Sequence, residues 1–225
     1  MNVVIIGGGQ KFGKLLANKF IDSGANVYIL SHKDYGNNPN HLSTNFLNIV
    51  DVVEQFSKLT SAIERIDLLF YNTNADLGPC SVEDYKSYSD IGKINDAWHN
   101  TITVQAVVPH ILSISALSKM DANSKIVFMT SNLAFDIPRD YCQWSSGQPG
   151  GKASQNHMMF ALSNYNDKNT IVYSIATHLE YEYKEKVSNV LNQIYNNLIT
   201  IDKTLSGQIV QIYYNGDAAK LESSG

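Results

Sequence analysis

Short apolar runs alternate with segments of helical periodicity along the whole chain. The apolar runs are rich in β-branched residues and largely lack polar alternation, which is typical of strands buried on both faces of a sheet. The runs predicted to be strands are 2–6, 26–30, 67–71, 125–130, 170–176 and 207–214. The segments predicted to be helices are 14–23, 52–65, 96–120, 152–165 and 183–198. Strands that alternate with helices in this way predict βαβ units.

Repeated βαβ units predict an α/β fold, a doubly wound parallel sheet of about seven strands with helices on both faces. The chain of 225 residues is long enough for one domain, which we place at residues 1–216. Residues 217–225 (DAAKLESSG) carry no strand or helix pattern. We expect them to be disordered or to be an expression-derived tail.

Composition excludes several classes of protein. The net charge is −4 and no long Lys/Arg run is present, which argues against a dedicated nucleic-acid binder. The two cysteines and six scattered histidines lack the spacing of metal ligands, so we expect no metal site. The sequence shows no signal-peptide pattern and no run of about 18 apolar residues. A cytoplasmic protein without a membrane partner is the resulting expectation.

A glycine-rich turn follows the first predicted strand, in the segment 6–13 (IGGGQKFG). Ligands of such sheets bind beyond the carboxyl ends of the strands. Glycines let the backbone approach a pyrophosphate, and the next helix offers its N-terminal N–H groups. The third glycine of G-x-G-x-x-G is absent here, so a tight turn without a ligand stays possible. The position after the first strand favours dinucleotide binding, by Gly7, Gly9, Gln10, Lys11, Phe12 and Gly13.

The end of the second predicted strand bears on the choice of dinucleotide. NAD sites place an Asp or Glu near this point, whereas NADP sites need cations or hydroxyl donors for the 2′-phosphate. The residues here are Ser31, His32 and Lys33, with Lys11 close by in the glycine-rich turn. They predict a preference for NADP(H) over NAD(H), and a merely solvated turn is the alternative.

With these motifs in order, the chain resembles the short-chain dehydrogenases/reductases, and it does so over essentially its whole length. The turn at 7–13 is similar to the family's TGxxxGxG, with Lys11 in place of the middle glycine. Asn45 or Asn48 falls where the family often has an Asp that contacts adenine. The other matching positions are Asn72, Thr73 and Asn74 at the NNAG segment, Ser131 at the catalytic Ser, Lys152 at the catalytic Lys, and 206–210 at the last strand.

The resemblance implies a Rossmann-type fold and a definite chemistry. In the family a Tyr exchanges the proton, the Ser polarises the carbonyl, and the Lys holds the ribose and lowers the Tyr pKa. The family motif Tyr-x-x-x-Lys puts Gln148 at the Tyr position, and Gln has no titratable proton. Gln105 stands where the family has a supporting Asn, and Thr177 opens the segment that usually reads Pro-Gly. Thr177 remains a candidate for contact with the cofactor.

Three interpretations of this altered site stay open. The first is an active NADP(H)-dependent oxidoreductase acting on carbonyls or alcohols, with Tyr141 as proton donor and Trp144 able to close over the nicotinamide. His178 is a second conceivable donor. The second is a catalytically silent NADP(H)-binding sensor or regulatory protein. The third is an elimination or isomerisation that uses Ser131 and Lys152 without hydride transfer.

The expected partners are an unidentified small-molecule substrate and further copies of the chain. Family members commonly dimerise or tetramerise through the helix that follows the catalytic Lys. In this chain that helix carries apolar residues on more than one face, which fits a homodimer or homotetramer and equally fits a central helix of a monomer. These residues are Met158, Met159, Phe160 and Leu162.

Overall fold

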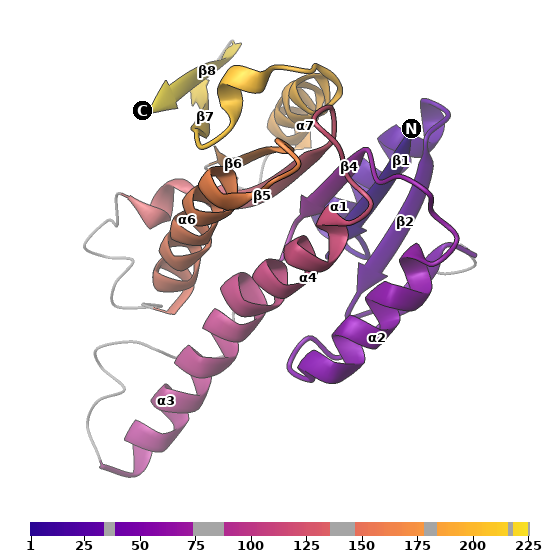
Figure 1. The fold of residues 1–225 in the computed structure, drawn as a ribbon. Helices are drawn as coiled ribbons and strands as arrows, with labels where there is room; N and C mark the ends of the chain where they lie inside the picture. The colour runs from indigo at the N-terminus through magenta and orange to yellow at the C-terminus, as the bar shows by residue number, and fades with distance from the viewer. Residues whose placement is uncertain (34–38, 74–87, 136–146, 178–183, 216–217, 225) are drawn as a thin grey trace.

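One twisted sheet organises the protein, as a computed structural model shows (Figure 1). The structure describes residues 1–33, 39–73, 88–135, 147–177, 184–215 and 218–224. Over these residues the sheet has eight strands in the order β3-β2-β1-β4-β5-β6-β7-β8. The strands are β1 (Asn2–Ile6), β2 (Asn26–Ser31), β3 (His41–Ser43), β4 (Leu68–Tyr71), β5 (Lys125–Ser131), β6 (Ile171–Thr177), β7 (Ile209–Asn215) and β8 (Ala218–Ser224).

Helices cover both faces of this sheet. The longer helical segments are α1 (Lys11–Asp22), α2 (Ile49–Thr60), α3 (Tyr88–Ile102), η2 (Thr103–Val107), α4 (Val108–Leu117), α6 (Gly147–Tyr165) and α7 (Lys184–Ile199). Two short turns, η3 (Asn132–Ala134) and η4 (Lys203–Leu205), follow β5 and α7. Helices α1 and α7 pack on one face, and α2, α4 and α6 pack on the other. The doubly wound α/β fold predicted from the sequence is therefore confirmed.

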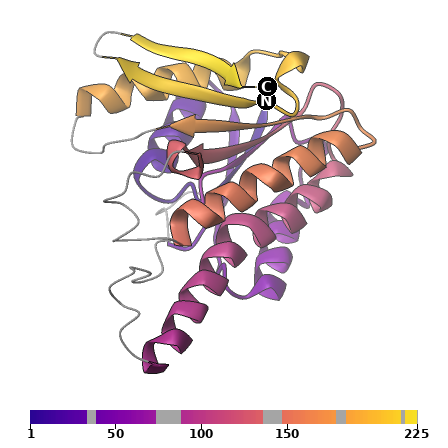
Figure 2. The ribbon, with the colours of Figure 1, turned by 90° about the vertical axis from the view of Figure 1, so that its left-hand side faces the viewer.

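Seven neighbouring strands, β3-β2-β1-β4-β5-β6-β7, run parallel, as predicted. Strand β8 is antiparallel to β7, and the two lie side by side at the end of the sheet (Figure 2). This corrects the expectation of a disordered tail, because residues 218–224 form the edge strand. Main-chain pairing with β7 holds such a strand, and composition alone does not reveal main-chain pairing.

The long helix predicted at 96–120 is interrupted by a π-helical turn. Pro109 has no N–H to donate to the carbonyl four residues earlier, at Gln105. The backbone there forms the π segment η2, in which the Val108 N–H donates to the Thr103 carbonyl. Figure 1 shows α3 and α4 as one long rod that crosses the sheet and extends beyond it. The proline thus displaces one turn without ending the rod.

The rod is also apolar enough to raise the question of a membrane. By length and composition, the stretch Ile91–Leu117 could cross a bilayer. However, 56% of its apolar window is buried inside the protein. The core helix of a soluble protein has the same character, because it covers a sheet with its apolar side.

Candidate dinucleotide and active site

The glycine-rich turn packs directly against the end of β4. Gly7 has φ +83°, and a Cβ there would lie 2.7 Å from the carbonyl oxygen of Asn72. A Cβ on Gly13 would lie 2.5 Å from the Gly7 oxygen and 2.7 Å from Asn72 Nδ2. The Asn72 side chain donates a hydrogen bond of 3.3 Å to that same Gly7 oxygen. Only glycine fits at either position, so the turn from β1 to α1 packs closely on the end of β4.

This turn lies at the point where the order of the strands reverses. β1 pairs with β2 on one side and with β4 on the other, so the connections leave it in opposite directions. In open α/β sheets a crevice opens at such a point, beyond the carboxyl ends of the strands. The predicted residues Gly7, Gly9, Gly13 and Asn72 therefore meet at the place where this class of fold binds nucleotides.

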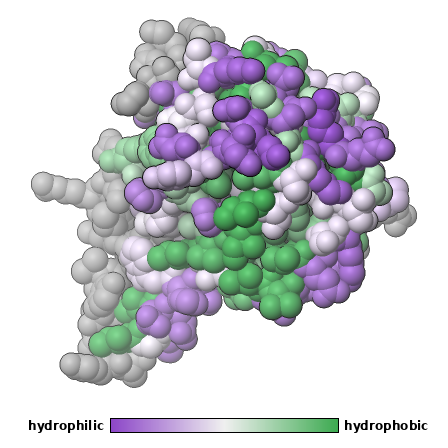
Figure 3. Space-filling model, in the orientation of Figure 1, coloured by the Kyte–Doolittle hydropathy of each residue, from purple (hydrophilic) through white to green (hydrophobic). Residues whose placement is uncertain are grey.

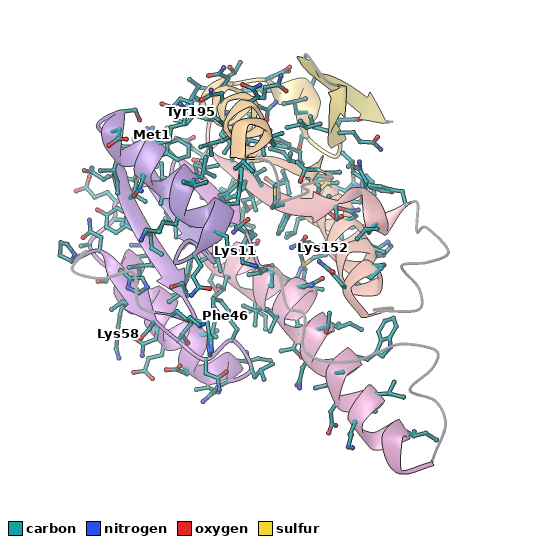
Figure 4. The ribbon with its side chains drawn as sticks, turned by 180° about the vertical axis from the view of Figure 1, so that it is seen from behind. Met1, Lys11, Phe46, Lys58, Lys152 and Tyr195 are labelled. Atoms are coloured by element: carbon teal, nitrogen blue, oxygen red, sulfur yellow. The ribbon has the colours of Figure 1, made fainter. Side chains whose placement is uncertain are left out.

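The N-terminus of α1 opens onto the same crevice. Gln10 precedes the helix and its side chain makes no capping hydrogen bond, and no acidic residue stands in the first turn. A helix end of this kind attracts anions through its N–H groups and its dipole. Lys11 adds a positive charge there (Figure 4). Its side chain is exposed, and its backbone has a φ of +46°. The arrangement fits a pyrophosphate.

The side chain of Phe12 lies in the core. Its side chain is 1% exposed and belongs to the core cluster between α1 and the sheet. The ring therefore takes the third glycine position for packing. Only the backbone of Phe12 is left to face a ligand.

The end of β2 lies against Gly9. A Cβ on Gly9 would lie 2.4 Å from Ser31 Oγ and 2.9 Å from the Lys33 carbonyl oxygen. Ser31 is 3% exposed, and its hydroxyl donates to that Lys33 oxygen and meets His41 Nε2 at 2.8 Å. The hydroxyl has one hydrogen, and it donates this hydrogen to the carbonyl oxygen of Lys33. In this arrangement Ser31 does not donate a hydrogen bond to a phosphate. The side chains of His32 and Lys33 are exposed beside it.

The two asparagines after β3 make different local hydrogen bonds. Asn48 is the N-cap of α2 and accepts from the Asp51 N–H, so it has a structural role. Asn45 is exposed, and its side-chain oxygen accepts from the Leu47 N–H at 3.1 Å. Hydrogen bonds from Thr44 and from the Asn45 N–H lower the pKa of Asp51. Asn45 thus differs from Asn48 in lying before α2 and not capping it.

Lys152 joins α6 to the ends of two strands. Its Nζ donates to the carbonyl oxygens of Thr73 and Met129, each at 2.7 Å, and more weakly to Gln155 Oε1 at 3.4 Å. The residue is 4% exposed. Burial lowers the pKa of the ammonium group to about 7. These three bonds involve all three N–H groups, so a ligand would have to replace the long bond to Gln155.

Close packing between α3, η2 and α6 sets the position of this lysine. A Cβ on Gly150 would lie 2.5 Å from the Trp98 ring, and one on Gly151 would lie 2.4 Å from Gln105 Oε1. Gln105, which stands at the family's Asn position, is fully buried. The two glycines let the helices approach, and Lys152 follows directly after them.

Ser131 and Thr177 lie side by side at the carboxyl ends of β5 and β6. Ser131 is partly exposed and its Oγ accepts from the Leu133 N–H at 3.2 Å, which leaves its proton available to a substrate. Thr177 is 5% exposed. Within the described part of the chain, the buried hydroxyl of Thr73 has no hydrogen-bond partner. A ribose hydroxyl is a suitable partner for such a group.

Several predicted residues fall elsewhere. Asn74, Tyr141, Trp144 and His178 lie outside the described residues. Two residues that sequence reasoning missed are His41 and Gln155, which touch Ser31 and Lys152. No motif marks them, although Gln155 stands three residues after Lys152 and so shares its helix face.

Comparison with known proteins gives matches among solved structures. No protein-family model matches the chain, and no curated protein matches its sequence. An oxidoreductase of the short-chain dehydrogenase/reductase family from Brucella ovis, solved with a partially ordered NAD, has a TM-score of 0.74 at 16% identity and covers 94% of this chain and 99% of its own. BdcA, solved in complex with NADPH, has a TM-score of 0.75 at 14% identity over 98% of this chain and 95% of its own. An apo SCOR enzyme from Clostridium thermocellum has a TM-score of 0.73 at 17% identity over 96% and 95%.

Identities this low show the fold alone. The protein has the Rossmann-type fold of the solved short-chain dehydrogenases/reductases, and the resemblance seen in the sequence is confirmed at that level.

Proposed function

We propose that the protein is an NADP(H)-binding oxidoreductase of the short-chain dehydrogenase/reductase type. Its reaction is hydride transfer between the nicotinamide and a small carbonyl or alcohol. The observation that carries the proposal is the close turn of Gly7 and Gly13 on Asn72, at the reversal of strand order. Neighbours in fold bind NAD and NADPH, which supports a nicotinamide cofactor.

The described residues divide between the two halves of such a cofactor. The start of α1 with Lys11 would hold the pyrophosphate, and the turn 31–33 with Asn45 would hold the adenosine half. Thr73, together with the N–H that Lys152 gives weakly to Gln155, would hold the nicotinamide ribose. The bound nicotinamide would supply or accept the hydride, and the Ser131 hydroxyl would donate a hydrogen bond that polarises the substrate oxygen.

The proton at the site needs a second group, because Gln148 cannot titrate. We keep Tyr141 in this role as a proposal, since it lies in the segment between Ser131 and Lys152. Loss of turnover in Tyr141→Phe with intact nucleotide binding is the expected result. Full activity of that variant would remove Tyr141 from the mechanism.

A titration followed by turnover tests the function. We expect NADPH to raise the Tm more than NADH does, and a panel of small carbonyls to give turnover with NADPH. Ser131→Ala should lower turnover by about 10²-fold, while Ser115→Ala on the exposed side of α4 should not. Stabilisation by neither nucleotide would overturn the proposal. Binding without turnover on any carbonyl, unchanged by Ser131→Ala, would favour the silent sensor.

The setting of the enzyme is proposed on the same basis. We place it in the cytoplasm, with a small-molecule substrate and with further copies of itself as its protein partner.

A further inference from the structure

Hydrogen bonds connect strand β3 to the turn 31–33, at the proposed adenosine end of the site. His41 lies in that strand, next to β2, and its ring is partly buried. Its Nε2 meets Ser31 Oγ at 2.8 Å. Ser31 in turn donates to the carbonyl oxygen of Lys33, two residues further on. One buried hydroxyl thus joins the turn after β2 to strand β3.

The direction of this chain of bonds follows from its protons. The Ser31 hydroxyl has one proton, and the Lys33 oxygen can only accept it. The Nε2 of His41 must therefore carry a hydrogen and donate it to Ser31 Oγ. This fixes the tautomer or charge state of the ring as one with hydrogen on Nε2. Two hydrogen bonds, from His41 to Ser31 and from Ser31 to Lys33, hold the turn 31–33 in one conformation. We call this pair of hydrogen bonds the 31–33 clasp.

The clasp sits where the two dinucleotides differ. Gly9 of the glycine-rich turn faces this turn so closely that a Cβ there would meet both Ser31 Oγ and the Lys33 oxygen. The exposed side chains of His32 and Lys33 project from the clasped turn. A phosphate at the 2′ position needs cationic donors held in place, whereas a 2′-hydroxyl needs an acceptor such as a carboxylate.

We propose that His41 is a positioning residue that sets the preference of this site for a 2′-phosphorylated dinucleotide. It acts through Ser31, by holding the turn that carries His32 and Lys33. The inference rests on the proposed function and names the residue outside the motifs that decides between NADP(H) and NAD(H). A merely structural role would weaken both nucleotides alike, so the ratio of the two affinities separates the two roles.

The test measures the Kd of NADPH and of NADH by calorimetric titration. His41→Leu removes the donor and should weaken NADPH about tenfold while changing NADH less than about twofold. His41→Gln keeps an N–H donor and should retain most of the preference. His99→Leu, at an exposed histidine of α3, is the matched control and should change neither Kd.

A double-mutant cycle tests the 31–33 clasp itself. Ser31→Ala should reduce the preference as His41→Leu does, and the double variant should lose no more than either single one, because both break the same chain of bonds. An unchanged ratio in His41→Leu, with the wild type preferring NADPH, overturns the inference alone. A wild type that binds neither nucleotide overturns the proposed function, and the inference with it. Equal binding of both nucleotides by the wild type overturns the inference and the NADP(H) preference but leaves dinucleotide binding in place.

Discussion

Lys152 is a buried cation whose three hydrogen-bond partners are uncharged. Two backbone carbonyls and one amide oxygen surround its Nζ, and desolvation lowers its pKa to about 7. In the unfolded chain a lysine has a pKa of about 10.4. At a pH between these two pKa values, Lys152 carries its proton in the unfolded chain and has lost it in the folded one.

This difference predicts how stability depends on pH. The free energy of unfolding should rise as pH increases from about 7 towards 10, because the unfolded state binds more protons there. Lys152→Met should flatten that rise, whereas Lys58→Met, at an exposed lysine that pairs with Glu54, should not. Urea denaturation at pH 7, 8 and 9 measures the slopes. Equal slopes in wild type and Lys152→Met would contradict the lowered pKa.

Lys11 occupies a backbone conformation that suits glycine. Its φ of +46° costs a non-glycine residue on the order of 1 kcal/mol. Lys11→Gly should therefore raise the free energy of unfolding by roughly 0.5–1 kcal/mol and also weaken NADPH, because the charge is lost. Lys14→Gly, one turn into α1, should lower stability by about 1 kcal/mol. Chemical denaturation and titration measure both effects, and a Lys11→Gly variant that is less stable than wild type would contradict the strain.

How much of the site the sequence could predict depends on the kind of signal each residue leaves. Ser131 ends a strand with a clear apolar pattern, and Lys152 lies in a helix with a clear helical pattern. The positions of both residues near the carboxyl ends of the strands could therefore be predicted. His41 could not, because its contact with Ser31 depends on the pairing of β3 with β2, and a three-residue strand leaves no periodicity. Motif position predicts that Phe12 contacts the cofactor, and it does not reveal that the apolar ring packs in the core.

At the scale of elements, the apolar runs predicted the inner strands to within a residue or two. Helix starts were less well predicted: α1 begins at Lys11 and α6 at Gly147, earlier than 14 and 152. Glycines in these first turns hide the helical pattern, since their small size serves packing. The π turn and the edge strand β8 depend on a missing N–H and on main-chain pairing, which hydropathy does not encode.

The packing of α6 on the rod α3–η2–α4 gives an element-scale prediction. Gly→Ala in a helix usually stabilises by roughly 1 kcal/mol. Gly151→Ala should instead destabilise, because its Cβ would meet Gln105 and Thr101. Gly92→Ala in α3, where nothing lies within 4 Å, should stabilise as usual. In thermal or urea unfolding, we expect the two variants to change the free energy of unfolding in opposite directions. Stabilisation by both changes would contradict the close packing of α6 on the rod.

At the scale of the whole molecule, the surface of α4 and α6 bears on self-association. Most of the α6 residues expected to meet a partner pack inside the protein instead, with Met159 at 0% and Leu162 at 6% exposure. Phe160 is 38% exposed, Ile114 of α4 is 54% exposed, and Val107, the last residue of η2, is 38% exposed. Figure 3 shows hydrophobic surface gathered over α4 and its neighbours. We propose this face as the contact between copies of the chain.

Light scattering on a sizing column measures that proposal. The wild type should run as a dimer or tetramer, and Ile114→Glu with Phe160→Glu should make it monomeric, because burying a carboxylate in an apolar contact is costly. Leu15→Glu on α1, also exposed, is the matched control and should leave the oligomer intact. A monomeric wild type at micromolar concentration would contradict the expected self-association.

The central claim is that a dinucleotide binds over the glycine-rich turn that joins β1 to α1 and packs on the end of β4. Calorimetric titration of NADPH into the wild type, Gly13→Ala and Gly92→Ala tests it most directly. Gly13 has no room for a methyl group between Gly7 and Asn72, whereas Gly92 lies in open space. We expect the wild type and Gly92→Ala to bind alike and Gly13→Ala, if folded by circular dichroism, to bind at least about tenfold more weakly. Equal binding by all three proteins, or binding by none, would contradict the account.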